Sequence, residues 1–214
     1  MESIVIAKYN EDTTWTTNLQ KHDTNCIVYS KGPHSHPLEI NLPNVGRESH
    51  TYAYHIVNNY ENLANVTVFL QGNPFDHLPA GGIDQLLKEA RSHPSGLSQN
   101  ARVHDVGCNN AYYGFTIHNH MGCKVSPFLN NQPFGIWLKQ TCNIAYQKSP
   151  RWYIGACFAA TRKAIQSVSL ETWKDILKSL EYDANPVTGH YMERSWYMLM
   201  DLEKEHLFKT KHLL

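Results

Sequence analysis

An aspartate and a histidine directly follow an apolar segment in the first half of the chain. Residues 66–70 read Val-Thr-Val-Phe-Leu, and a run that is β-branched or apolar at each position is typical of a strand buried on both faces of a parallel sheet. The Gly-Asn-Pro sequence at 72–74 ends this strand, and Asp76 and His77 follow. Ligands of open α/β sheets bind at the carboxyl ends of strands, where Asp76 could hold a divalent cation and the cation a phosphate. The alternative is a polar loop in which Asp76 caps the next segment.

Apolar runs and their periodicity predict the elements that would position this turn. Short apolar runs predict strands over residues 4–7 and 25–29. Apolar residues three and four positions apart predict a helix over 48–63, directly before the strand at 66–70. A strand–strand–helix–strand order is typical of α/β proteins. The sequence therefore predicts one domain with a mixed, mostly parallel central sheet flanked by helices.

The remaining segments continue this pattern. Residues 92–116 are rich in Gly, Asn, Ser and Tyr, which predicts a long surface segment with one or two short strands. Ser169 is a suitable N-cap for a helix that follows it. Further elements are expected as helices over 83–91, 134–145 and 191–206 and a strand over 152–160.

Three polar loops should meet at one edge of the predicted sheet. They span residues 9–12, 31–32 and 73–77, and the carboxyl ends of parallel strands share an edge. Together with Arg47 they offer carboxylates, two cations and aromatic rings. A nucleotide needs a ring for its base, an acid for its ribose hydroxyls and a cation for its diphosphate. Each residue alone is also typical of a solvated turn or a core position, so the convergence carries the prediction.

Composition excludes some classes of function. Lys+Arg and Asp+Glu both number 19, so the formal net charge is zero, and nucleic-acid binding through a basic face is not expected. The longest apolar runs are about five residues, too short for insertion into a membrane, and the first residues do not resemble a signal peptide. The five cysteines form no Cys-x-x-Cys pair, which favours free thiols and a cytoplasmic location.

Four motifs, taken together, are similar to those of a known group of proteins. They read Ala-Lys-Tyr-Asn-Glu-Asp-x-x-Trp at 7–15, Asn-Val-Gly-Arg-Glu-Ser-His-Thr-Tyr at 44–52, the segment 66–77, and Met-Glu-Arg-Ser-Trp at 192–196. The set resembles a family of fungal and large-virus proteins related to glycosyltransferases of the GT-A fold. Within that family the similarity extends to the first domain of a chlorella-virus glycosyltransferase that builds glycans on the major capsid protein.

The resemblance implies a single GT-A-like, Rossmann-like domain over residues 1–214. It also implies an enzyme that moves a sugar from a UDP-sugar donor to a glycan or glycoprotein acceptor with Mn²⁺ or Mg²⁺. For a viral protein the implied location is the host cytoplasm. A metal-dependent phosphoesterase and a catalytically weak nucleotide- or carbohydrate-binding module remain alternatives.

Metal ligands follow from the same resemblance. The GT-A signature is Asp-x-Asp after a central strand, and only one of its two acids is present here. Asp76 would be the direct metal ligand, and Asn73 or Gln71 would contact the ribose. A histidine near the C-terminus often supplies another ligand, which points to His190, with His77 as the other choice.

The remaining site residues are also implied by the resemblance. Glu193 corresponds to an acid beside the acceptor hydroxyl and is the expected base, with an ion pair to Arg194 as the alternative. Trp152 and Tyr153 would form the acceptor floor, because sugars pack on aromatic rings. The nucleotide-sugar contacts are expected from Tyr9, Asn10, Asp12, Lys31, Arg47 and Asn73.

Overall fold

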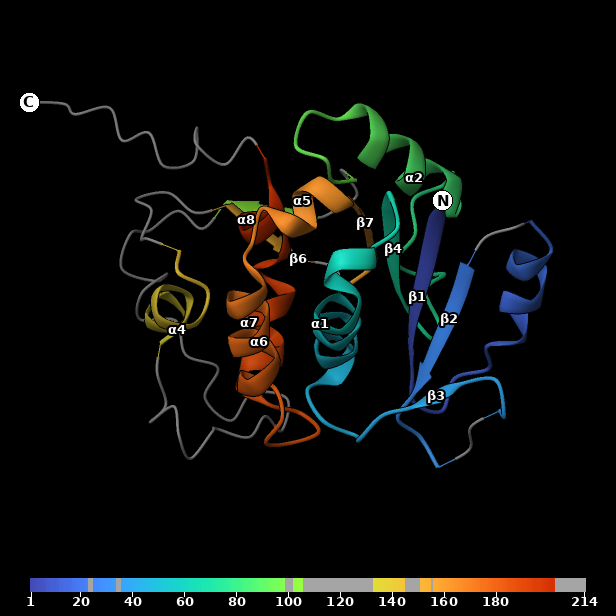
Figure 1. Ribbon diagram of the computed structural model, residues 1–214, viewed down its shortest axis with the longest axis horizontal. Helices are drawn as coiled ribbons and strands as arrows, with labels where there is room; N and C mark the ends of the chain where they lie inside the picture. The colour runs from blue at the N-terminus through green and yellow to red at the C-terminus, as the bar shows by residue number, and fades with distance from the viewer. Residues whose placement is uncertain are drawn as a thin grey trace, which may run out of the picture.

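A five-stranded sheet with the order β3-β2-β1-β4-β7 forms the centre of the molecule (Figure 1). The structure is a computed structural model and describes residues 1–22, 25–33, 36–98, 102–105, 133–144, 151–154 and 156–202. The strands are β1 (Glu2–Lys8), β2 (Asn25–Ser30), β3 (Ile40–Asn41), β4 (Val66–Gln71) and β7 (Phe158–Thr161). The first four are parallel, and β7 pairs antiparallel with β4. The predicted Rossmann-like α/β fold with a mixed, mostly parallel sheet is confirmed.

Helices cover both faces of this sheet, as the period of two along β1 requires. Val5 and Ala7 belong to one buried cluster, whereas Ile4 and Ile6 belong to the other. The first cluster includes residues of α1 (Arg47–Asn59), α4 (Phe134–Thr141), α5 (Arg162–Gln166), α6 (Leu170–Ser179), α7 (Val187–Glu193) and α8 (Trp196–Met200). The second includes residues of α2 (Gly82–Ser92), with Trp15 and Leu19 of the 3₁₀ helix η1 (Thr14–His22) packed against it. Figure 1 shows α1, α6 and α7 together on one side of the strands.

Four predicted elements are wrong in part. The expected helix over 191–206 is two short helices, α7 and α8, with Arg194 and Ser195 between them, and residues 203–206 lie outside the described part. Helix α7 begins earlier than expected because Pro186, at its N-cap, is compatible with a helix start, and the apolar period alone does not reveal this.

The expected strand over 152–160 is also two elements. Its first half is β6 (Arg151–Ile154), which pairs antiparallel with β5 (Arg102–Asp105) in a separate two-stranded sheet. Its second half is β7 of the central sheet. The predicted helix over 134–145 ends at Thr141, and the one over 48–63 ends at Asn59 before a 3₁₀ turn, η2 (Tyr60–Asn62). Most of the predicted long segment over 92–116 lies outside the described residues.

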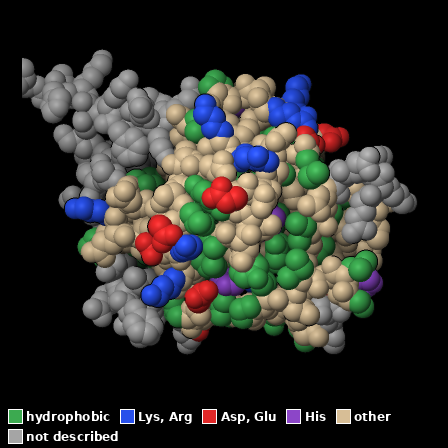
Figure 2. Space-filling model, in the orientation of Figure 1, with side chains coloured by type: hydrophobic (Ala, Val, Ile, Leu, Met, Phe, Trp, Pro, Cys, Tyr) green, Lys and Arg blue, Asp and Glu red, His purple; other side chains and the backbone are tan. Residues whose placement is uncertain are grey.

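The described surface is mixed in charge. On the face drawn in Figure 2, Lys and Arg side chains are interspersed with Asp and Glu. Among the described residues, no helix is both long enough and apolar enough to span a bilayer. The cysteines in the described part, Cys26, Cys142 and Cys157, are free thiols.

Candidate functional site

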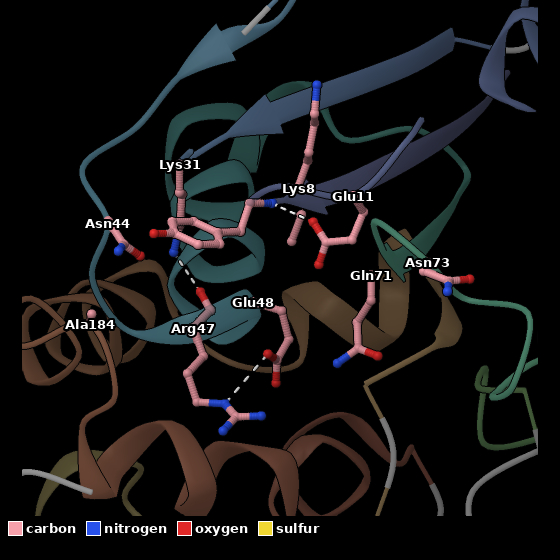
Figure 3. A pocket seen from close by; sticks show the side chains of 11 residues that line it. Lys8, Glu11, Lys31, Asn44, Arg47, Glu48, Gln71, Asn73 and Ala184 are labelled. Carbon is pink, nitrogen blue, oxygen red and sulfur yellow. Dashed lines mark hydrogen bonds and ion pairs between the residues drawn. The ribbon is translucent and has the colours of Figure 1, made fainter. Parts of the chain in front are cut away.

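A pocket of about 320 Å³ lies at the carboxyl edge of the sheet (Figure 3). The chain builds the sheet outward from β1 through β2 to β3, and then returns to the other side of β1 with β4. Open α/β sheets bind ligands where the strand order reverses in this way. The pocket is lined by residues that follow β1, β2 and β4 and by the start of α1, among them Tyr9, Glu11, Lys31, Arg47, Glu48, Gln71 and Asn73.

Close backbone contacts hold the strand-end loops together. The Lys31 amide donates to the Lys8 carbonyl, and a Cβ atom at Gly32 would overlap the Tyr9 carbonyl oxygen. Glu11 Oε2 accepts a 2.6 Å hydrogen bond from the Tyr9 amide. A Cβ atom at Gly72 would lie 2.8 Å from this carboxylate oxygen, so the loops after β1, β2 and β4 meet only because both glycines lack side chains.

Lys31 anchors the first turn of α1. Its ammonium donates to the carbonyl oxygens of Val45 and Arg47, each at 2.5 Å. These carbonyls flank a backbone segment in which Gly46 and Arg47 both have positive φ, 64° and 52°. Burial lowers the pKa of Lys31 to about 7, although the nearby charge of Glu48 acts in the opposite direction. Burial thus opposes the charged form of Lys31, while its two hydrogen bonds to carbonyl oxygens are those of an ammonium donor.

Arg47 and Glu48 form the floor of the pocket. The Nε atom of Arg47 lies 3.6 Å from Oε2 of Glu48, and the Glu48 side chain is only 9% exposed. The Arg47 guanidinium also donates across to Asn185, at 3.4 Å. Figure 3 shows Glu48 pointing between Arg47 and Gln71.

Glu193 lies close enough to this floor for the two carboxylates to interact. Burial, and then the like charge of Glu48, raise the pKa of Glu193, while the charges of Arg194, Arg47 and His77 lower it. Arg194 Nη1 lies 3.7 Å from Glu193 Oε2, so the expected ion pair is present as well. A carboxylate with a raised pKa is better suited to accept a proton near neutral pH.

His190 is buried, and its Nε2 atom contacts two protein side chains. Its Nε2 lies 3.0 Å from Asn185 Oδ1 and 3.4 Å from Arg47 Nη1. A metal ion at this nitrogen would stand against the guanidinium, and the two positive charges would repel each other. The geometry at Nε2 therefore disfavours a metal ion at this atom, and His190 as a metal ligand stays a prediction.

The expected nucleotide contacts fall into two groups. Tyr9, Lys31, Arg47 and Asn73 line the pocket together, as the convergence of strand ends predicts. Two others do not. Asn10 is exposed and outside this lining. Asp12 faces an adjoining pocket, where it accepts a 2.9 Å hydrogen bond from the Thr14 amide at the start of η1, and this bond lowers its pKa.

Asp76 and His77 lie on an exposed turn after β4, outside the pocket lining. The amide of His77 donates to the Pro74 carbonyl, which closes the turn. In the described parts of the chain, no three His, Cys, Asp or Glu side chains are grouped to hold a metal ion. Mg²⁺, however, is commonly bound through one or two carboxylates together with substrate phosphates and water, and a single exposed Asp76 is compatible with that mode.

The predicted acceptor floor is only partly described. Trp152 and Tyr153 lie on β6, opposite His104 and Val103 of β5, in the small separate sheet. Their side chains lie outside the described part of the structure.

Sequence reasoning missed Glu48 and treated Glu11 only as a turn residue. An acidic residue in the first turn of a helix is ordinarily explained by the helix dipole, so the residue type of Glu48 did not single it out. The signal that could have found it is the pair of residues before it. Gly46 occupies the N-cap, where a residue with a capping side chain is usual, and the cation Arg47 follows.

A family model described as a protein of unknown function (DUF3431) matches residues 4–212. The chain belongs to this family. Comparison with curated proteins and with solved structures found no significant match.

Proposed function

We propose that this DUF3431 protein is a metal-dependent glycosyltransferase that binds a UDP-sugar in the pocket at the carboxyl edge of its sheet. The observation that carries the proposal is the position of the pocket at the reversal of strand order, lined jointly by Tyr9, Lys31, Arg47 and Asn73. The resemblance to GT-A glycosyltransferases supplies the reaction, and the site supplies groups that suit the donor. The acceptor is proposed to be a glycan or glycoprotein, which for a viral protein would include capsid glycans in the host cytoplasm.

The charges of the pocket suit a nucleoside diphosphate. Lys31 and Arg47 offer positive charge beside the first turn of α1, where helix N-termini favour anions. Tyr9 is 46% exposed and lies at the same rim, so its ring is available to stack on a base. Asn73 has both donor and acceptor groups for the ribose.

Glu193 is the proposed base for the acceptor hydroxyl. Burial raises its pKa, and the charges of Glu48 and Arg47, two residues that line the pocket, act on it, although Glu193 is not itself one of the lining residues. Removing the hydroxyl proton as the new bond forms would make the acceptor oxygen a better nucleophile. Lys31 and Arg47 would stabilise the negative charge that develops on the departing diphosphate.

Asp76 is the residue we propose to hold Mn²⁺ or Mg²⁺, together with the phosphates of the donor. A bound divalent cation would neutralise charge on the diphosphate leaving group. Asp76 is exposed on its turn, so replacing it should leave the fold intact. His77 is the nearest histidine in sequence, and its charge already acts on Glu193.

Titration calorimetry with UDP tests this function. UDP should bind more tightly with Mn²⁺ than with EDTA, and more tightly than GDP or ADP, and Asp76→Ala should remove the difference between Mn²⁺ and EDTA. Failure of UDP to bind with Mn²⁺ would refute the proposal. With UDP-sugars and glycan acceptors, release of UDP supports a transferase, release of phosphate a phosphoesterase, and binding without turnover a binding module.

A further inference from the structure

Glu48 is a pocket-lining residue with a carboxylate oxygen that accepts no hydrogen bond from the residues that the structure describes. Its side chain is 9% exposed, and Oε2 makes a long 3.6 Å contact with Arg47 Nε. Among the described residues, none donates a hydrogen bond to Oε1. A buried carboxylate oxygen without a donor costs free energy, so a fold that retains one at a ligand pocket suggests that a ligand satisfies it.

The neighbouring cations, Lys31 and Arg47, do not donate a hydrogen bond to Oε1. The Lys31 ammonium is directed at the carbonyls of Val45 and Arg47, and the Arg47 guanidinium is shared with Asn185 and His190. In Figure 3, Glu48 points into the space beside Gln71, away from the Lys31 side chain. Oε1 itself is buried, but Glu48 lines the pocket, so rotation of its carboxylate presents this oxygen to a donor that enters there.

The chemistry of a carboxylate narrows what that donor can be. An ionised carboxylate only accepts hydrogen bonds, so it repels phosphate oxygens and pairs with O–H or N–H groups. In a UDP-sugar, most such groups are hydroxyls of the ribose and of the transferred sugar. Glu48 acts electrostatically on Glu193, which the proposed function puts beside the acceptor, so it belongs to the end of the pocket where the sugar reacts.

We propose that the Glu48 carboxylate turns toward the pocket, accepts a hydrogen bond from a hydroxyl of the transferred sugar and thereby selects among UDP-sugars. This inference rests on the proposed function, because it requires that a UDP-sugar occupies the pocket. Sites that hydrogen-bond a substrate hydroxyl reject analogues that lack it much more strongly than apolar pockets do. Glu48 would then be a residue that determines donor specificity, in contact with the substrate.

Calorimetry with UDP and UDP-glucose on the wild type, Glu48→Gln and Glu171→Gln tests the assignment. Glu171 is the matched control, since it is also the second residue of its helix, but its side chain is 79% exposed and paired with Lys174. We expect Glu48→Gln to weaken UDP-glucose binding about 10- to 100-fold, the usual range for a hydrogen bond to a charged group, with UDP affinity little changed. Glu171→Gln should change neither affinity.

A set of monodeoxy UDP-glucose analogues identifies the hydroxyl. The wild type should bind one of these analogues about as weakly as Glu48→Gln binds UDP-glucose, and that analogue should lose nothing further in the variant. The melting temperature of Glu48→Gln without ligand should equal or exceed that of the wild type, because a buried charge with an unpartnered oxygen is removed.

Several results would overturn the assignment. Equal weakening of UDP and UDP-glucose would place the hydrogen bond on the ribose, which 2′-deoxy-UDP and 3′-deoxy-UDP would confirm. Loss of Mn²⁺ binding in the variant without nucleotide would make Glu48 a metal ligand, and a large fall in melting temperature would make it structural. If the wild type binds neither UDP nor UDP-glucose, the proposed function itself fails before Glu48 is at issue.

Discussion

Helices α1 and α6 begin in opposite ways, although both have an acidic residue in the first turn. Helix α6 begins after Ser169, whose hydroxyl accepts a hydrogen bond from the Thr172 amide, and its acidic residue Glu171 is exposed. Helix α1 begins after Gly46, which has positive φ and no side chain to cap the helix, and its acidic residue Glu48 is buried.

We interpret the difference as that between a helix start that serves stability and one that serves the proposed site. At α6 each residue type favours helix formation. The serine hydroxyl accepts a hydrogen bond from a first-turn amide, and the exposed acid interacts favourably with the helix dipole. At the start of α1 the backbone is left-handed, the half-buried Lys31 reaches in from the end of β2, and one oxygen of Glu48 has no hydrogen-bond donor among the described residues. Departures from local rules of this kind are expected at functional sites.

The largest effect should come from Glu193, the proposed base, whose carboxylate interacts with Glu48 at the start of α1. Glu193→Gln should lower the rate of UDP release in the presence of acceptor by roughly 10²–10⁴-fold, the usual cost of losing a general base. Donor affinity should change little, because the amide keeps the shape of the side chain. Steady-state kinetics with acceptor varied at saturating UDP-sugar measure this.

The control for that experiment is Glu171→Gln at the start of α6, which should leave both kcat and KM unchanged. A rise in acceptor KM with kcat unaltered would instead make Glu193 a residue that positions the acceptor. Near-wild-type values for both constants would remove Glu193 from the site.

Replacing the N-cap residue of each helix should separate the energetic effect of backbone strain from that of capping. A Cβ atom at Gly46 would lie 2.6 Å from His50 Cβ and 2.8 Å from Leu180 Cβ, and φ is 64°. Gly46→Ala should therefore lower the free energy of unfolding by about 2–4 kcal/mol, through left-handed strain and overpacking. Ser169→Ala should cost about 1 kcal/mol, through loss of the cap.

Urea denaturation of both variants provides the measurement. Gly82→Ala isolates the backbone effect, because Gly82 also has positive φ, 60°, but a Cβ atom there would meet nothing within 4 Å. We expect it to cost about 1–2 kcal/mol, less than Gly46→Ala. Equal costs for the two glycines would show that crowding at α1 contributes nothing.

A third effect is a pH dependence of stability that comes from Lys31. Its pKa of about 7 in the folded protein lies below the ordinary value of 10.5, so the unfolded chain binds more protons between these two pH values. The contribution of Lys31 to the free energy of unfolding should therefore rise with pH above 7, by about 1 kcal/mol per pH unit. Below pH 7 the lysine is protonated in both states and the slope should vanish.

Denaturation of the wild type and Lys31→Met from pH 6 to 9 measures this slope as the difference between the two proteins. Lys174→Met, on the exposed face of α6, is the control and should give a difference that does not vary with pH. A constant difference for Lys31→Met as well would mean that Lys31 keeps its proton over this interval.

By itself, the sequence determined the central strands, α1, α2 and the serine-capped start of α6. Runs such as Val66–Leu70 and the cap at Ser169 act through near neighbours, so their structure follows from local patterns. The same logic predicted that Tyr9, Lys31 and Asn73 would meet, because parallel strands share an edge.

Only the tertiary structure decided what those groups do once they meet. The burial of Glu48, the commitment of Lys31 to two carbonyls and the contact of His190 with Arg47 depend on segments far apart in the chain. The split of residues 151–161 into strands of two sheets likewise depends on which partner each half finds. Burial and hydrogen-bond partners are properties of the packed fold, and a sequence pattern has no direct access to them.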